Sequence, residues 1–111
     1  MAGALNVFKT VTANLTTTMT TVYTAPLGYS TVVLMAQVTN IDTVSTAEIS
    51  ANVVRTGGST SLIKNAKVPV GDAITVVTGR LVIEENDSFA IAATANNVSQ
   101  LTLSVLESLV G

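Results

Sequence analysis

The chain has 111 residues, a formal net charge of −2, and no cysteine, histidine or tryptophan. The length fits one domain, and the missing cysteine and histidine exclude a disulfide framework and the commonest metal ligands and general base. Only 11% of the residues are charged and the basic ones are scattered, so we expect no nucleic-acid partner.

Threonine and valine dominate the sequence, and both are β-branched residues that suit strands. A surface of Thr, Ser, Asn, Gln and Ala is unusual for a free monomer, because solubility usually depends on charged side chains. It suits a protein whose faces are covered by neighbours, since interface cores are depleted of charge. The mean hydropathy is +0.56, but no run of about 18 apolar residues occurs, so we expect no membrane span.

The first segment, residues 1–18, leaves two alternatives open: a first strand of the domain, or an arm that reaches a neighbouring molecule. Residues 19–111 are predicted to form the domain itself. Met19–Ala25 predicts a strand that ends at Pro26. Ser30–Asn40 predicts the longest strand, and simple alternation puts these residues on one face: Val32, Leu34, Ala36 and Val38.

The middle of the chain alternates most cleanly. In Ala47–Arg55 one face is apolar and the other polar, which is typical of a strand with one face in the core. The segment Thr56–Ser59 predicts a hairpin turn, and Ser61–Val68 predicts the strand that follows it, stopped by Pro69.

Residues 68–95 hold three short apolar runs separated by turn residues, and we expect them to form the centre of the domain. Gln100–Leu106 predicts the final strand, with Leu101, Leu103 and Val105 on one face. No segment shows a sustained helical period. The count of about eight or nine short strands predicts an all-β fold, an antiparallel β-sandwich of jelly-roll type.

The only acidic cluster, Glu84–Asp87, could bind a hard cation such as calcium, but its spacing matches no EF-hand. A turn between strands needs these residue types anyway, and we favour the turn. No serine has a histidine to activate it. We therefore expect a protein that is not an enzyme and has no metal site and no cofactor.

Two tyrosines, Tyr23 and Tyr29, flank the Pro26 turn. They could contact a sugar or a partner, but we favour a structural role as half-buried rim residues with the hydroxyl in water. The candidate interface residues are Val7, Phe8, Tyr23 and Tyr29.

Three motifs carry a resemblance: Tyr-Thr-Ala-Pro-x-Gly at residues 23–28, Val-Pro-x-x-Asp-Ala at 68–73, and Gly-x-Leu-Val-Ile-Glu-Glu-x-Asp-Ser at 79–88. Residues 22–109 resemble small structural proteins of tailed bacteriophages, especially phages of marine cyanobacteria. Relatives often have glycine where this chain has Asn86, and asparagine also tolerates a left-handed turn.

The resemblance implies a β-sandwich component of the virion, assembled in the host cytoplasm, with no catalytic residues. We expect a capsid decoration or cement protein that forms a symmetric homo-oligomer, with a trimer favoured. Its partners would be further copies of itself and the major capsid protein or other virion proteins. The alternative is a neck, tail or fibre component that binds a receptor or glycan.

Overall fold

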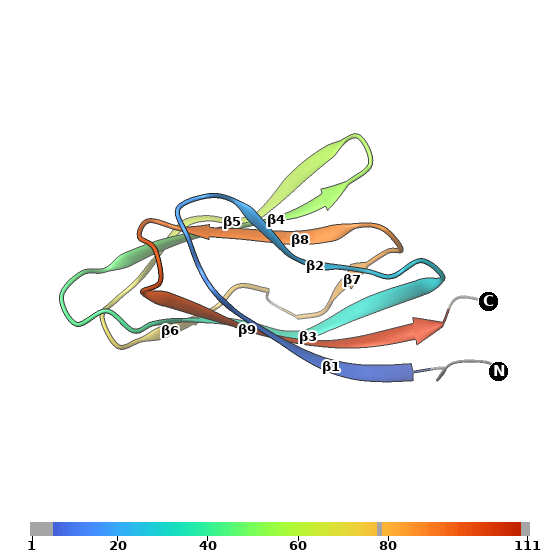
Figure 1. The fold of residues 1–111 in the computed structure, drawn as a ribbon, viewed down its shortest axis with the longest axis horizontal. Coiled ribbons are helices and arrows are strands. Elements are labelled where there is room, and N and C mark those ends of the chain that lie inside the picture. The colour runs from blue at the N-terminus through green and yellow to red at the C-terminus, as the bar shows by residue number, and fades with distance from the viewer. Residues whose placement is uncertain (1–5, 78, 110–111) are drawn as a thin grey trace.

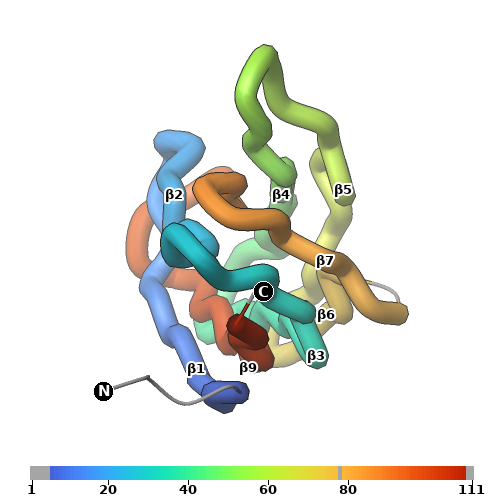
Figure 2. Tube along the Cα trace, turned by 90° about the vertical axis from the view of Figure 1, so that its right-hand side faces the viewer, coloured from blue at the N-terminus to red at the C-terminus, as the bar shows by residue number. Residues whose placement is uncertain are grey.

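The computed structural model describes residues 6–77 and 79–109, and within these ranges the regular secondary structure is entirely β-strand. The strands pack as two antiparallel layers (Figures 1 and 2). They are β1 (Asn6–Asn14), β2 (Thr20–Thr24), β3 (Tyr29–Asn40), β4 (Ala47–Arg55), β5 (Gly58–Val68), β6 (Ala73–Thr75), β7 (Leu81–Ile83), β8 (Ser88–Ala93) and β9 (Ser99–Leu109).

The strand order follows the jelly-roll scheme. The first sheet has the order β1-β9-β3, with β6 and β7 both paired to the far side of β3; the second has the order β2-β8-β4-β5. The first strand thus pairs with the last, the second with the next to last, and so on inward until β4 pairs with β5 across a tight turn. The predicted all-β antiparallel sandwich is confirmed.

The first strand, β1, lies at the edge of the first sheet. It pairs with β9 along its whole length, from Asn6 opposite Ser108 to Asn14 opposite Gln100. The described part of residues 1–18 therefore contains a strand of the sandwich, while residues 1–5 lie outside the described residues. Leu15, directly after β1, is only 2% exposed and closes one end of the core.

The hydrophobic core lies between the two sheets, and strict alternation predicted most of it. Most side chains that the alternation placed inward on β4, β8 and β9 are at most 6% exposed: Ala47, Ile49, Ala51, Phe89, Ile91, Ala93, Leu101, Leu103 and Val105. Val53, on the same face of β4, is half-buried.

The predicted faces of β3 are wrong in its first half. Val33, Ala36 and Val38 are buried, whereas Leu34 and Met35 are both exposed. The pairing with β9 shifts between Val33 and Met35, which marks a β-bulge. The extra residue changes the phase of the alternation, so Val32 and Leu34 do not share the inward face of Ala36.

Residues 68–95 form the centre of the domain only in part. β8 lies between β2 and β4 in the second sheet, but β6 and β7 are three-residue strands at the edge of the first sheet. Between them, Val76 and Val77 are buried without belonging to a strand. In the first sheet the central positions belong to β9 and β3 instead.

Asn40 fixes the loops at one end of the sandwich, where β3 ends. Its buried side chain donates hydrogen bonds from Nδ2 to the carbonyl oxygens of Ser45 (3.0 Å) and Val68 (2.9 Å). Its Oδ1 accepts a bond from the backbone N–H of Asp42 at 2.9 Å. One amide group therefore satisfies three backbone groups, two in the loop after β3 and one at the end of β5.

We expect Asn40→Ala to lower the free energy of unfolding by about 2–3 kcal/mol, because a buried carbonyl, a part-buried carbonyl and one N–H lose their partner. The measurement is chemical denaturation followed by circular dichroism. Asn14→Ala is the control: Asn14 is exposed and accepts one bond from Gln100, so its loss should be within about 0.5 kcal/mol. Equal losses in the two variants would contradict this role of Asn40.

Candidate docking surface

The outer surface of the first sheet carries a line of apolar side chains. Phe8 of β1 lies opposite Leu106 of β9, Leu106 opposite Val32 of β3, and Val32 opposite Val82 of β7. Residues opposite each other in a sheet project on the same side. Phe8 and Val82 are 74% and 55% exposed, and Leu106 and Val32 are partly buried. These four side chains thus form an apolar row across four strands that is exposed to solvent.

The β-bulge in β3 enlarges this apolar row. Because the bulge adds one residue, neither Leu34 nor Met35 enters the core, and they are 43% and 37% exposed. Met35 lies opposite Ser104 of β9, whose neighbours Leu103 and Val105 point inward, so Met35 projects outward. The apolar area therefore extends along β3.

The rest of this surface is polar but uncharged. The remaining outward residues are threonine, serine, asparagine and glutamine with one alanine, and two cross-strand hydrogen bonds join them, from Gln100 Nε2 to Asn14 Oδ1 and from Ser108 Oγ to Asn6 Oδ1. We call the whole surface the uncharged face. It comprises Asn6, Phe8, Thr10, Thr12, Asn14, Ser30, Val32, Leu34, Met35, Gln37, Thr39, Ala73, Thr75, Val82, Gln100, Thr102, Ser104, Leu106 and Ser108.

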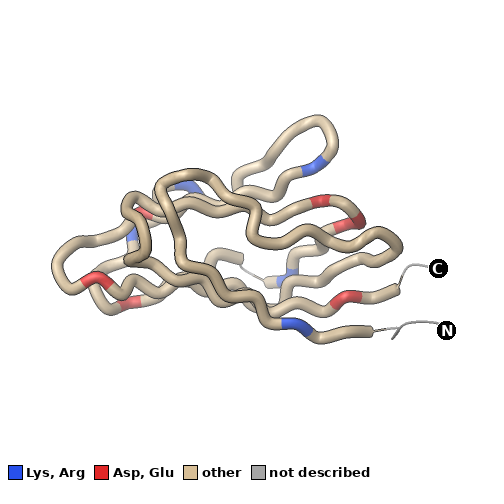
Figure 3. The backbone as a smooth tube through the Cα atoms, viewed as in Figure 1, with Lys and Arg blue, Asp and Glu red and all other residues tan. Residues whose placement is uncertain are grey.

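Charged side chains lie elsewhere in the described part of the chain. Figure 3 shows Lys, Arg, Asp and Glu mostly near the two ends of the sandwich and in the β4–β5 region. On the outer surface of the second sheet Glu48 lies opposite Lys67, and β5 also carries Lys64. The two outer surfaces therefore differ in character: among the described strand residues, those that face outward from the first sheet are uncharged, whereas those of the second sheet include Glu48 and Lys67.

Inside the sandwich, Tyr23 and Glu107 form a polar cluster that bridges the two sheets. The Tyr23 hydroxyl donates to Glu107 Oε2 at 2.6 Å and lies 2.7 Å from Thr31 Oγ1. Lys9 Nζ lies 3.1 Å from Glu107 Oε1. Glu107 is 3% exposed, so its charge is compensated by the ammonium and the phenol.

Burial and, to a smaller extent, the hydrogen bond to Glu107 together raise the pKa of Tyr23 from its usual 10.0 to about 12. Both effects disfavour the phenolate, which would place a second negative charge beside the carboxylate.

The four candidate interface residues lie in different environments. Phe8 is prominent on the uncharged face, whereas Val7 lies opposite the inward-facing Glu107 and is half-buried. Tyr29 is half-buried at the start of β3. The expectation that both tyrosines keep the hydroxyl in water is wrong for Tyr23, which is 8% exposed and bonded to Glu107.

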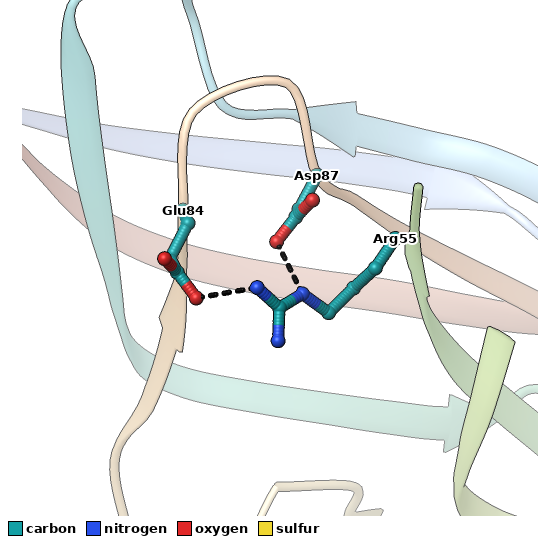
Figure 4. Close-up of polar contacts among 3 residues, drawn as sticks. All are labelled: Arg55, Glu84 and Asp87. Carbon is teal, nitrogen blue, oxygen red and sulfur yellow. Dashed lines mark hydrogen bonds and ion pairs between the residues drawn. The ribbon is translucent and has the colours of Figure 1, made fainter. Parts of the chain in front are cut away.

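The acidic cluster forms a turn, as favoured from the sequence. The N–H of Asp87 donates to the carbonyl of Glu84 at 2.9 Å, and Asn86 has the left-handed φ of 68°. Arg55, at the end of β4, donates from Nε to Asp87 at 2.9 Å and from Nη2 to Glu84 at 2.7 Å (Figure 4).

The third carboxylate of this turn, Glu85, accepts a bond from the N–H of Gly28 at 2.7 Å. Each carboxylate of the turn thus fastens a neighbouring segment. A depression of about 350 Å³ beside them is lined by Arg55, Thr56 and these three acids. Within residues 6–77 and 79–109 no three acidic, histidine or cysteine side chains are grouped as metal ligands would be. The same ranges contain no helix long and apolar enough to cross a membrane.

No protein-family model matches the sequence, and no curated protein matches it. Among solved structures, a protein of Bacillus endospore appendages, described as disulfide-linked pili, aligns with a TM-score of 0.53 and 11% identity over 96% of this chain and 88% of that one. This likeness concerns the fold alone.

Two structures of a pentameric capsid protein from metagenomic phage sequences align at 16% identity with TM-scores of 0.47. The alignments span 86% of this chain but only 60% and 58% of the capsid proteins' own length. These likenesses are too remote to assign a function.

We expect Tyr23→Phe to lower the free energy of unfolding by about 1–2 kcal/mol at neutral pH, because Glu107 loses a buried donor. The wild type should also lose stability as the pH rises from 10 towards 12. In that window the unfolded chain releases the Tyr23 proton while the folded chain retains it, since the pKa is raised on folding.

In Tyr23→Phe this part of the alkaline destabilisation should be absent. Unfolding midpoints in urea across pH 8–12 provide the measurement. Tyr29→Phe is the matched control, because it removes a hydroxyl from the half-buried Tyr29 and leaves the bond between Tyr23 and Glu107 in place. Parallel pH profiles for the wild type and Tyr23→Phe would contradict the assignment.

Proposed function

We propose that this protein is a non-enzymatic structural component of a bacteriophage virion that docks through the uncharged face. The observation that carries the proposal is the absence of charge from that face, as far as residues 6–77 and 79–109 describe it, with the apolar row of Phe8, Leu106, Val32 and Val82 across it. The phage-like motifs of the sequence supply the virion setting. The most specific form of the proposal is a capsid decoration protein that forms an oligomer on the shell.

Docking removes water from the side chains of the uncharged face, and the cost of this desolvation depends on their charge. Burying an unpaired charge is expensive, whereas threonine, serine and amide side chains can exchange water for hydrogen bonds with a partner. The apolar row then supplies the favourable term, because covered hydrocarbon contributes roughly 25 cal/mol per Å². A stable interface typically buries about 800 Å² on each side. A sheet surface that spans β1, β9, β3 and the β6 and β7 edge suits an interface of that kind.

Two further observations support a structural role over catalysis or sugar binding. Glu84, Glu85 and Asp87 are engaged by Arg55 and by the Gly28 N–H, and Glu107 is engaged by Tyr23 and Lys9. These acidic side chains therefore connect segments of the fold through hydrogen bonds and ion pairs. A sugar-binding platform would need exposed aromatic rings, and the hydroxyl of Tyr23 is bonded inside the sandwich.

The Bacillus appendages are described as disulfide-linked, and these 111 residues contain no cysteine. These residues therefore cannot form a disulfide bond to a neighbour. We infer that these residues associate with neighbours without disulfides.

The first test is quantitative mass spectrometry of intact phage particles, purified through a density gradient, from the source of this sequence. We expect the protein to co-purify at a high and fixed number of copies relative to the major capsid protein. A low copy number would favour the neck, tail or fibre. Absence from intact particles would refute the proposal.

The second test places a charge on the uncharged face. Val82→Lys should reduce incorporation into particles about tenfold or more, because the ammonium group would have to be desolvated on docking. Val44→Lys is the matched control: Val44 is 82% exposed in the loop after β3, so incorporation should stay at the wild-type level. Equal incorporation of both variants would show that docking uses another surface.

A further inference from the structure

The edges of the two sheets differ in how well they are protected from other chains. An edge strand exposes unpaired N–H and C=O groups, and natural proteins usually blunt it by shortness, bulges or lysine. β2 has five residues and a register shift, and β6 and β7 have three residues each. β5 carries Lys64 and Lys67, with Asn65 between them in a left-handed conformation, φ 52°.

β1 is neither short nor bulged, and its one lysine, Lys9, is paired with Glu107 of the neighbouring strand. It has nine residues, contains neither glycine nor proline, and pairs with β9 without any register shift. Within the described part of the chain it pairs with β9 alone, and most of its side chains are exposed. β1 is therefore a long, regular edge whose outer N–H and C=O groups are open to a further strand.

The single charge on β1 restricts which register a further strand can take. Lys9 points to the inner side of the sheet, where its ammonium binds Glu107 of β9. In a symmetric antiparallel pair centred on Lys9, two ammonium groups would lie directly opposite each other, which is destabilising. A pair centred on Thr10 places Lys9 opposite Val11 instead, and it uses all nine residues of the strand.

We propose that β1 pairs antiparallel with β1 of a second copy of this chain, about a two-fold axis at Thr10. The outer side then has Thr10 opposite Thr10, Phe8 opposite Thr12, and Asn6 opposite Asn14, and each of these pairs is uncharged. The two first sheets become one continuous sheet, and the two uncharged faces merge into one surface. A two-fold pair takes the place of the trimer that we expected from the sequence. The pairing deepens the proposed function by naming a self-association surface, but it can be tested without any virion.

Cysteine cross-linking tests the register directly, because the chain has no native cysteine. In Thr10→Cys the two new side chains lie opposite each other across the axis, with Cβ atoms about 4.5–5.5 Å apart, near the spacing of a disulfide. Mild oxidation of the purified protein should convert most of it to a covalent dimer.

Thr12→Cys is the matched control, since it lies on the same strand and the same side. Its copy in the second chain is displaced by four residues, roughly 13 Å along the strand, which is too far for a disulfide. Similar cross-linking of both variants, or none in Thr10→Cys, would overturn the proposed register.

A pair of lysine variants separates edge pairing from face-to-face stacking. Thr10→Lys puts two ammonium groups opposite each other and should raise the dimer dissociation constant about tenfold or more in analytical ultracentrifugation. Thr102→Lys adds the same charge on the same face, but in the interior of the sheet on β9, and should leave the dimer intact. Loss of the dimer in Thr102→Lys, or a wild type that stays monomeric at high concentration, would overturn the proposal. A monomer that still enters particles would leave the proposed function standing.

Discussion

The position of β9 between β1 and β3 governs the rest of the structure. Its inward residues Leu101, Leu103 and Val105 are fully buried, and its outward residues alternate with them. Because the side-chain period of a strand is two, a slip of one residue would turn this hydrophobic set towards water. The core therefore fixes the register of β1 and β3 against β9. That same register aligns Phe8, Leu106 and Val32 on the outside, so the packing of the interior also determines the composition of the exterior.

How much of the fold could be predicted from the sequence depended on how strictly each strand alternates. The inward faces of β4 and β9 could be predicted because apolar and polar residues alternate along most of each strand. In β8 both faces are apolar, and the larger Phe89 and Ile91 distinguished the inward one. The bulge in β3 could not, since Val32–Val38 is apolar on both faces and gives no sign of a phase change. The uncharged face also depends on pairings between residues nearly a hundred positions apart. Phe8 was identified from the sequence, but its neighbour Leu106 follows only from the register.

Among the polar residues, too, contacts between sequence neighbours could be predicted and contacts between distant residues could not. The turn at Glu84–Asp87 could be predicted because Asn and Asp favour turns by local hydrogen bonding. Its partner Arg55 lies on another hairpin and is brought close by the pairing of β4 with β8, which places Val54 opposite Ser88. Tyr23 was expected at the rim because tyrosine is amphipathic. It is instead held by Glu107, a residue 84 positions away, which no local pattern reveals.

The bulge that turns Met35 outward also makes the surface chemically vulnerable. Met35 is 37% exposed, so peroxide can reach its side chain, and oxidation would convert the thioether into a polar, chiral sulfoxide amid the apolar side chains of β3. Met35 would then be oxidised faster in free subunits than in docked subunits, because a covering partner would shield the sulfur. The extent of Met35 oxidation would thus distinguish subunits that had remained free from subunits that had been assembled.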